Sequence, residues 1–413
     1  KALLGSAHFL TLAKYSNLMG VNIDGNVSPN GPKMQARKDA IVEGFRKGVS
    51  GLVQANKIKI FKGTGIAKSA NKVLVTDNSG TTEIETKNII LATGSQPVEI
   101  PVFPFDGKTI ISSKETLSLA NVPQSMVIIG GGVIGCEMAC VYATVGTKVT
   151  IVEALASILP NEDPWVSQML TREFKKLGIE TLAGRKVMGV TVSGGMGKVS
   201  LDDGQTVDAE KVLVAVGRKA SCDKETIDNL GLKTTRGSVI EVNKKMETNV
   251  KGVYAIGDVV GTTYLAHGAF AEAEVAAANA TGGNETFGDY NLIPRAVYTF
   301  PEVASIGKNE TKCEKEGIET VVGKAMFKSN GRSVAHNENA GEVRVIRNKA
   351  DNKIVGITMV GAAVTEMLAA ARALIGTTEK ITDICFAHPT VSEVLKEAWE
   401  DAFGISLHVP PRP

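Results

Sequence analysis

The feature that most constrains this chain is a glycine-rich turn, Gly130-Gly-Gly-Val-Ile-Gly135, which directly follows an apolar run from Met126 to Ile129. An apolar run without polar alternation is typical of a parallel strand that is buried on both faces. The spacing of three of these glycines predicts a dinucleotide-binding turn between such a strand and a helix. In that turn Gly130 allows the tight bend, Gly132 lets the backbone approach a pyrophosphate, and Gly135 lets the helix lie close to the strand.

The residues that follow complete the same unit. We expect a helix over residues 133–144, in whose first turn Val133 and Ile134 adjoin the cofactor, and then an apolar strand that ends at Glu153. From Gly135 to Glu153 the interval is 153 − 135 = 18 residues, close to the roughly 20 expected for the carboxylate that binds a ribose 2′-hydroxyl. A 2′-phosphate would need a basic residue, and the next four residues have none. The unit therefore predicts NAD binding, although the glycines alone could serve only a turn.

Composition limits the remaining possibilities. A chain of 413 residues is too long for one ordinary core and predicts roughly two to four domains. Lysine plus arginine (46) nearly balance aspartate plus glutamate (44), which argues against a nucleic-acid or membrane surface. No apolar run reaches the roughly 18 residues of a membrane span, and no metal site is predicted. The five scattered cysteines indicate a reducing compartment, with a bacterial cytoplasm preferred to a mitochondrial matrix. Cys136 and Cys140 are interpreted as small apolar helix residues in preference to a redox pair.

Three further apolar stretches end on a glycine, where small residues let a backbone come near a ligand. They are Ile89–Ser95 with Thr93 and Gly94, Val212–Arg218 with Gly217, and Gly252–Asp258. Their similarity hints at two related nucleotide-binding halves. Taken alone, the first is better explained as a strand followed by a glycine turn, and the last as an ordinary Gly-Asp turn.

Hydrophobic periodicity predicts the rest of the architecture. Helices are expected over residues 2–15, 34–55, 267–280 and 363–375, and strands over Ile58–Phe61, Val73–Thr76, Thr82–Ile84, Val343–Ile346 and Ile354–Val360. From Pro294 onward the pattern favours a separate α+β unit.

The segment from His388 to Glu393 has two interpretations. Thr390-x-x-Glu393 matches a capping box, so that Glu393 would hold the start of a helix and His388 would be a surface residue. Alternatively, Glu393 orients and charges the imidazole of His388, which then acts as a general base toward a thiol. The two are compatible, because one carboxylate oxygen can cap while the other faces the ring.

Together these motifs resemble the pyridine nucleotide-disulfide oxidoreductases, and among them the members that oxidise dihydrolipoyl groups. The resemblance runs over all 413 residues. It rests on Lys1-Ala-Leu-Leu, Ala92–Ser95, the Gly130 turn, Val214–Arg218, Tyr254–Asp258, Leu265–His267, Tyr298–Ala304 and Ala387–Glu393. The resemblance implies an α/β fold with two Rossmann-like dinucleotide-binding domains, for FAD and NAD, and a C-terminal α+β dimerisation domain. Residues 1–108 and 223–290 would form the FAD domain, with its first part incomplete, residues 109–222 the NAD domain, and residues 291–413 the interface domain.

The resemblance also implies the roles of individual residues. Asp258 and the turn Leu265-Ala266-His267 would hold FAD, while Glu137 and Glu153 would face the nicotinamide cofactor. His388 and Glu393 would be an acid–base pair supplied by the second subunit of a homodimer. Further cofactor contacts are expected from Lys1, Thr93, Gly94, Gly217 and Arg218.

The implied reaction is oxidation of a dihydrolipoyl group on a lipoyl-bearing protein, of a 2-oxo acid dehydrogenase or a glycine cleavage complex. A substrate thiol deprotonated by His388 would attack an enzyme disulfide, and electrons would pass through FAD to NAD. A glutathione-reductase-like enzyme shares the His-Pro-Thr segment but prefers NADPH, which Glu153 argues against. A non-catalytic remnant that binds NAD is the other alternative.

One departure from the family concerns the start of the chain. Members carry an FAD-binding glycine loop and a Cys-x4-Cys disulfide before the lysine at which this sequence begins. We expect that residues 1–413 alone would be colourless and inactive, and that a chain extended by roughly 40 to 50 residues would be yellow and active.

Overall fold

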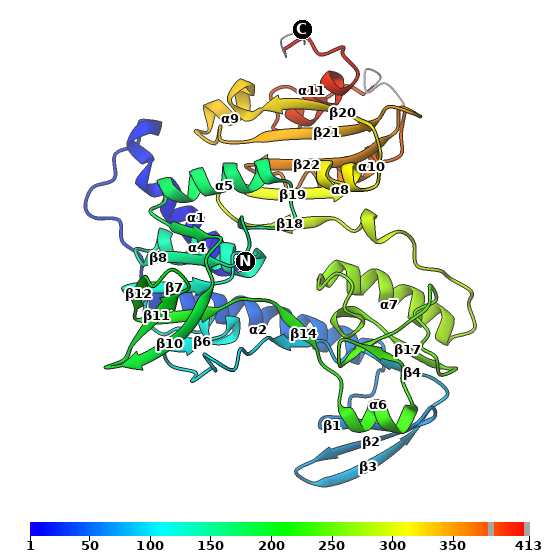
Figure 1. The fold of residues 1–413 in the computed structure, drawn as a ribbon. Coiled ribbons are helices and arrows are strands. Elements are labelled where there is room, and N and C mark those ends of the chain that lie inside the picture. Colours follow the sequence, from blue (N-terminus) through cyan, green and yellow to red (C-terminus); the bar gives the residue numbers. More distant parts are fainter. Residues whose placement is uncertain (379–383, 409–413) are drawn as a thin grey trace. The chain divides into compact units, whose positions relative to one another are not determined.

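The computed structural model describes residues 1–378 and 384–408, which form two compact units (Figure 1). Unit 1 comprises Lys1–Ile41, Glu99–Val216 and Pro294–Pro413, and unit 2 comprises Val42–Val98 and Gly217–Ile293. The long helix α2 (Gly31–Ala55) begins in unit 1 and ends in unit 2.

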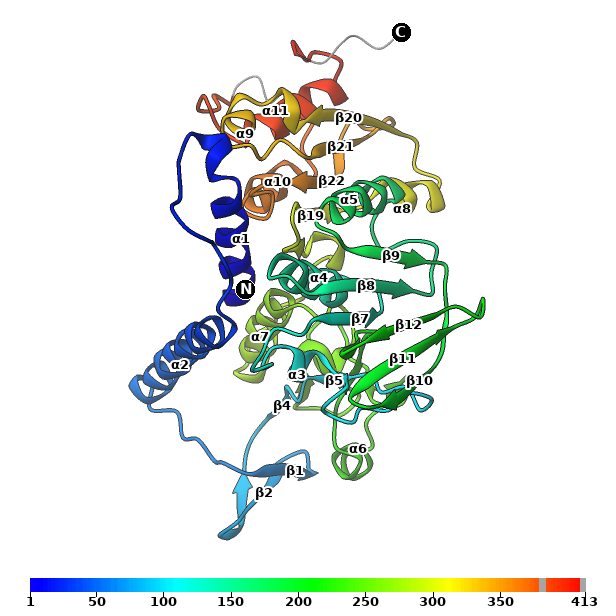
Figure 2. The ribbon, with the colours of Figure 1, turned by 90° about the vertical axis from the view of Figure 1, so that its left-hand side faces the viewer.

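Unit 1 contains a five-stranded parallel sheet around the glycine turn. Its strand order is β6 (Ile110–Ile111), β13 (Lys211–Val214), β7 (Ser125–Ile129), β8 (Lys148–Glu153) and β9 (Glu180–Ala183). Figure 2 shows β7, β8 and β9 in this order, with α4 (Val133–Thr144) beside them. The strand, helix and second strand predicted from the sequence are confirmed.

The alternation of side chains in β7 buries both faces of this sheet. Met126 and Ile128 pack with α1 (Ala2–Lys14), α4 and α5 (Pro164–Lys176). Val127 and Ile129 pack on the other face, against a three-stranded antiparallel sheet of β10 (Val187–Ser193), β11 (Met196–Leu201) and β12 (Thr206–Ala209). Coverage of both faces explains why the sequence of β7 is apolar throughout.

The C-terminal part of unit 1 is an antiparallel sheet in the order β18 (Arg295–Val297), β19 (Glu302–Gly307), β22 (Ile354–Gly361), β21 (Glu342–Asn348) and β20 (Thr320–Met326). Helix α11 (Glu393–Ala402) lies on β20 and β21 (Figure 1), and Trp399 at its centre is fully buried. This part is the α+β unit that the sequence predicts.

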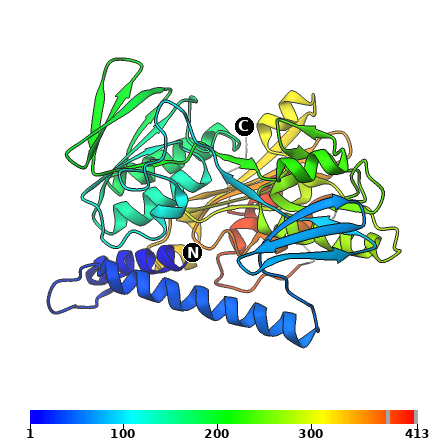
Figure 3. The same cartoon turned by 90° about the horizontal axis from the view of Figure 1, so that it is seen from below.

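Unit 2 contains a parallel pair, β4 (Ile89–Leu91) and β17 (Val253–Ala255), packed with helix α7 (Ala266–Ala280). It also contains the antiparallel sheet of β1 (Thr64–Ser69), β2 (Lys72–Asp77) and β3 (Gly80–Glu85), drawn in light blue in Figure 3. Because β4 and β17 are parallel, the residues after Leu91 and after Ala255 meet at the same edge.

The remaining elements are short. They are η1 (Ser16–Met19), β5 (Ser95–Pro97), α3 (Ser113–Thr116), β14 (Arg218–Ala220), α6 (Lys224–Leu230), β15 (Thr234–Thr235), β16 (Val239–Ile240), η2 (Gly257–Val260), η3 (Tyr290–Leu292), α8 (Glu310–Lys315), η4 (Phe327–Ser329), α9 (Gly331–Ala335) and α10 (Leu368–Leu374). In the part of the chain that the structure describes, no helix is long and apolar enough to span a membrane.

One predicted element is wrong, and another begins later than predicted. Residues 58–61 form no strand, since β2 pairs with β1 from Thr64 onward and the side chains of Ile58 and Ile60 are exposed. The helix expected over residues 363–375 begins only at Leu368. Ala363 has a φ of 57°, which a right-handed helix does not allow, and the Thr365 amide donates to Glu302 Oε2 instead.

Candidate functional site

Two of the three glycines in the turn after β7 are required by close backbone approach. Gly130 has a φ of 109°, and a Cβ added there would lie 2.5 Å from Ala215 O. A Cβ at Gly135 would overlap Gly130 O and lie 3.2 Å from Ile128 Cγ2. Gly135 therefore sets α4 directly against β7, as the sequence predicts.

Gly132 differs from the other two glycines, because no contact with the residues that the structure describes requires a glycine at this position. It is the N-cap residue of α4, with φ −74° and ψ −172°, and a Cβ there would meet nothing within 4 Å. No side-chain cap bond is present at this end of α4, and the first helix amides, at Val133 and Ile134, have no acceptor within the helix. Open space beside uncapped helix amides fits the pyrophosphate of a dinucleotide.

Glu153 lies at the end of β8, where the sequence places it. Only 8% of this residue is exposed, and each carboxylate oxygen accepts one backbone hydrogen bond. Gly131 N donates to Oε2 over 2.7 Å, and Leu155 N donates to Oε1 over 2.8 Å. Each oxygen keeps a lone pair, which fits a carboxylate held ready to accept from a ribose hydroxyl. The sequence did not identify Gly131 as a site residue. A Cβ added there would lie 2.7 Å from Ile158 Cγ2, so this position also favours glycine.

Glu137 on α4 lies in a contact that joins three segments of unit 1. Lys1 Nζ donates to its Oε1 over 2.8 Å, and Tyr298 N donates to the same atom over 3.0 Å. The ammonium of Lys1 also lies 3.6 Å from the centre of the Tyr298 ring, a favourable cation–π distance. Lys1 and Glu137, both predicted as cofactor contacts, are thus brought together, and Tyr298 is an additional positioning group.

Unit 2 brings another group of predicted residues to the edge where β4 and β17 end. The Ser95 hydroxyl donates to Asp258 Oδ2. Arg218 Nε donates to Ser95 Oγ over 2.7 Å, and its Nη2 to Ser95 O over 2.7 Å. Asp258 Oδ1 is left to accept from another donor, which fits a sugar hydroxyl. Arg218 thus holds Ser95, the last residue of the Ala92–Ser95 motif on which the family resemblance rests.

The other predicted cofactor contacts in unit 2 are close in sequence to Ser95, Arg218 and Asp258. Thr93 and Gly94, the latter with a φ of 75°, follow β4. Leu265 is the N-cap residue of α7 and has no side-chain cap bond, and Ala266 and His267 form its first turn. Gly217, with a φ of 130°, precedes Arg218.

His388 and Glu393 form the contact that the general-base interpretation of the sequence requires. Glu393 Oε1 lies 3.1 Å from His388 Nδ1, while Oε2 accepts from Thr390 N over 2.8 Å. Partial burial opposes ionisation of Glu393, but the Thr390 amide and the His388 ring outweigh it and lower the pKa of this carboxyl. The His388 side chain is 80% exposed.

The expected helix start at Thr390 is displaced. Helix α11 begins at Glu393, and the Thr390 hydroxyl pairs with Ser392 Oγ instead of a helix amide. Glu393 therefore binds the backbone of the segment before the helix. The hydrogen bond from Thr390 N fixes the orientation of the carboxylate that faces His388.

The cysteines offer no redox pair. All five are free thiols, and Cys136 and Cys140 are fully buried in α4. Burial raises the pKa of Cys140 to about 12 and that of Cys136 well above its ordinary value, so neither forms the thiolate that disulfide exchange needs.

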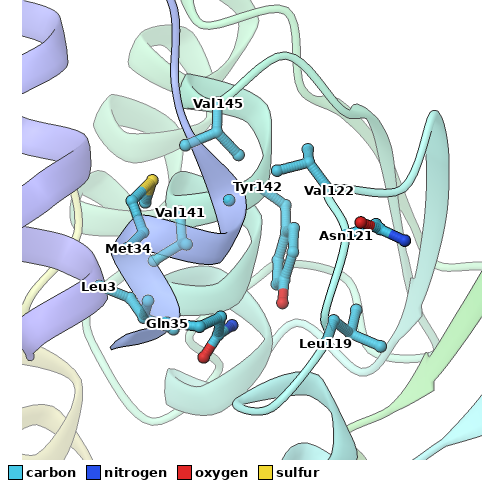
Figure 4. Close-up of a pocket in the computed structure, with 10 residues that line it drawn as sticks. Leu3, Met34, Gln35, Leu119, Asn121, Val122, Val141, Tyr142 and Val145 are labelled. Atoms are coloured by element: carbon cyan, nitrogen blue, oxygen red, sulfur yellow. The ribbon is translucent and has the colours of Figure 1, made fainter. Parts of the chain in front are cut away.

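The described residues also line cavities in each unit. One, of about 20 Å³, is lined by Leu3, Met34, Val141 and Tyr142 of α1, α2 and α4 (Figure 4) and has room for no more than a water molecule. The other, of about 480 Å³, lies in unit 2 and is lined partly by Phe287 and Tyr290.

Comparison with known families matches most of the chain. Residues 1–278 match the family described as pyridine nucleotide-disulphide oxidoreductase, and residues 293–399 match the dimerisation domain of that family. The dihydrolipoyl dehydrogenase of Geobacillus stearothermophilus is 36% identical over 419 residues, which cover 99% of this chain and 88% of that protein. The mitochondrial dihydrolipoyl dehydrogenase 2 of Arabidopsis thaliana is 36% identical over 420 residues, covering 99% and 82%.

Solved structures agree at the level of the fold. LpdA from Mycobacterium tuberculosis superimposes with a TM-score of 0.89 at 21% identity, covering 97% of this chain and 88% of that one. The flavoprotein disulfide reductase RclA from Escherichia coli, in a Cu(II) complex, superimposes with a TM-score of 0.86 at 22% identity, with the same coverage. The predicted α/β fold with a dimerisation domain is confirmed.

Proposed function

The chain belongs to the pyridine nucleotide-disulphide oxidoreductases, and from that premise we propose that His388 and Glu393 are its acid–base pair. Its activity is that of an NAD-dependent flavoprotein which oxidises dihydrolipoyl groups, since its relatives over nearly the whole chain are dihydrolipoyl dehydrogenases. The contact between Glu393 Oε1 and His388 Nδ1 carries the assignment of the pair.

The pair has a clear chemical task. Because the pKa of Glu393 is lowered, this side chain is a carboxylate at neutral pH and accepts from the protonated Nδ1 of His388. In the neutral imidazole this contact favours the tautomer with its proton on Nδ1, so that Nε2 is the nitrogen that can take a proton from a substrate thiol. The thiolate is the nucleophile in disulfide exchange, so removing this proton starts the reaction.

The cofactors are FAD and NAD, and we assign the observed residues to them. FAD, when bound, relays two electrons between thiols and NAD. The glycine turn with Val133 and Ile134 would hold the NAD pyrophosphate, and Glu153 the adenosine ribose. Thr93, Asp258 and the first turn of α7 would hold FAD.

The matched dimerisation domain supports a homodimer, in which we propose that His388 serves the site of the partner chain. The partner protein would carry a lipoyl group. Five free thiols support a reducing compartment, for which we propose a bacterial cytoplasm.

The experiment compares NAD reduction by dihydrolipoamide in the full-length protein and three variants. His388→Gln should lose on the order of 10²-fold or more in turnover, because the base is removed. Glu393→Gln should lose less, since a glutamine still contacts the ring. His336→Gln, at an exposed position after α9, is the matched control and should keep full activity. Full activity of His388→Gln would leave Glu393 with its structural contact to Thr390 only.

A further inference from the structure

Glu272 on α7 is a buried acid with no assigned role. Only 1% of it is exposed, and among residues 1–378 and 384–408 it takes part in no ion pair with a basic side chain. Its partners are neutral donors. Gly257 N donates to Oε2 over 2.6 Å, and the Tyr290 hydroxyl donates to Oε1 over 2.8 Å.

Such a group is costly to keep. Burial raises the pKa of Glu272, and the Gly257 amide and the Tyr290 hydroxyl only partly oppose that rise. A buried carboxyl without hydrogen bonds carries a large desolvation penalty, which the two hydrogen bonds to Glu272 partly offset. An apolar residue at position 272 would avoid this desolvation penalty, which argues that the hydrogen bond between Gly257 N and Glu272 has a role of its own.

The contact fixes the backbone beside Asp258. Gly257 has a φ of 71° and opens η2, and a Cβ there would lie 3.2 Å from Ala269 Cβ on α7. Glu272 and Ala269 therefore hold η2 against α7 from two positions one turn apart. The side chain of Asp258 is held separately, by Ser95.

We propose that Glu272 and Tyr290 are positioning residues for FAD, which keep η2 and α7 in register so that Asp258 and the first turn of α7 bind the same cofactor. The inference rests on the proposed FAD role of Asp258. Glu272 is the link between the two elements, and Tyr290 holds its second oxygen so that the first stays aimed at Gly257 N.

The test measures the dissociation constant of FAD, by flavin fluorescence, for apoprotein prepared from the full-length holoenzyme. Amide hydrogen exchange at residues 257–260 and thermal unfolding are followed on the same samples. Tyr290→Phe removes one hydroxyl without changing the shape of the ring. It should raise the dissociation constant about tenfold, because a buried carboxylate oxygen loses its donor, and should speed exchange at residues 257–260.

Glu272→Gln keeps an oxygen for Gly257 N and should weaken FAD binding less than Glu272→Leu, which offers none. Glu274→Gln, at an exposed position on the same helix, is the control and should change neither quantity. Unchanged FAD affinity in Tyr290→Phe, or a lower melting temperature with unchanged FAD affinity, overturns the inference.

Asp258→Asn separates this inference from the assignment beneath it. If Asp258→Asn weakens FAD binding while Tyr290→Phe and Glu272→Leu do not, only the positioning role fails. If Asp258→Asn leaves FAD affinity unchanged, the proposed FAD role of Asp258 fails and the positioning role with it.

Discussion

Gly132 and Gly135 should respond in opposite ways to the same small change. In Gly132→Ala the new methyl meets nothing in the protein, and the backbone angles of Gly132 suit alanine. Loss of glycine freedom in the unfolded chain should then raise the free energy of unfolding by about 0.4–1 kcal/mol. The methyl occupies the space where a pyrophosphate would approach the amides of α4. Loss of one charge-assisted hydrogen bond costs about 1.5–3 kcal/mol, so NAD should bind roughly 10- to 150-fold more weakly.

Gly135→Ala should instead destabilise the fold. Its methyl overlaps the backbone oxygen of Gly130, directly after β7, and crowds the buried side chain of Ile128 in β7, so neither atom can move away freely. Overpacking of this kind costs about 1–3 kcal/mol or more. Any loss of NAD affinity in this variant would follow from the displaced helix.

Calorimetric titration with NAD and urea unfolding, on both variants and the parent protein, measure the two quantities. The reasoning is refuted if Gly132→Ala keeps the NAD affinity of the parent within about twofold, or if it loses stability while Gly135→Ala does not.

Two further predictions use other groups. Glu153→Arg should narrow or reverse the preference for NAD over NADP in steady-state kinetics of the full-length protein. The change replaces a carboxylate held by Gly131 and Leu155 with a cation that suits a 2′-phosphate. Equal activity of the unmutated protein with both cofactors would contradict the role of Glu153. The hydrogen bond that His408 Nδ1 donates to the Glu397 carboxylate raises the pKa of His408, so this pair should contribute stability that is present below the ordinary histidine pKa and lost as pH rises through the raised one. NMR titration should show the His408 pKa returning to its ordinary value in Glu397→Gln, and an unshifted titration in the parent protein would count against the contact.

The sequence predicted those parts of the site that depend on neighbouring residues. The order of strand, glycine turn, helix and acid from Met126 to Glu153 is local, and the structure reproduces it closely. The two contacts of Glu393 were likewise predictable, because His388 and Thr390 lie within five residues of it.

Contacts between distant segments were not predictable in this way. Ser95 meets Asp258 across 163 residues, and Tyr298 meets Glu137 across 161, so no spacing rule predicts these contacts, although both residues lie in motifs that carry the family resemblance. The strand expected at residues 58–61 failed for a related reason. A strand needs a partner, and β2 pairs with β1, in which Gly65, Ala67 and Lys68 carry little strand propensity.

The central claim is tested most directly by comparing two reactions of one sample of full-length protein. One is NAD reduction by dihydrolipoamide, and the other is NADPH oxidation by oxidised glutathione, each measured by absorbance of the reduced nicotinamide. The account predicts rapid formation of NADH in the first reaction and far slower loss of NADPH in the second. Rapid oxidation of NADPH by glutathione disulfide, with no NADH formed from dihydrolipoamide, would contradict it.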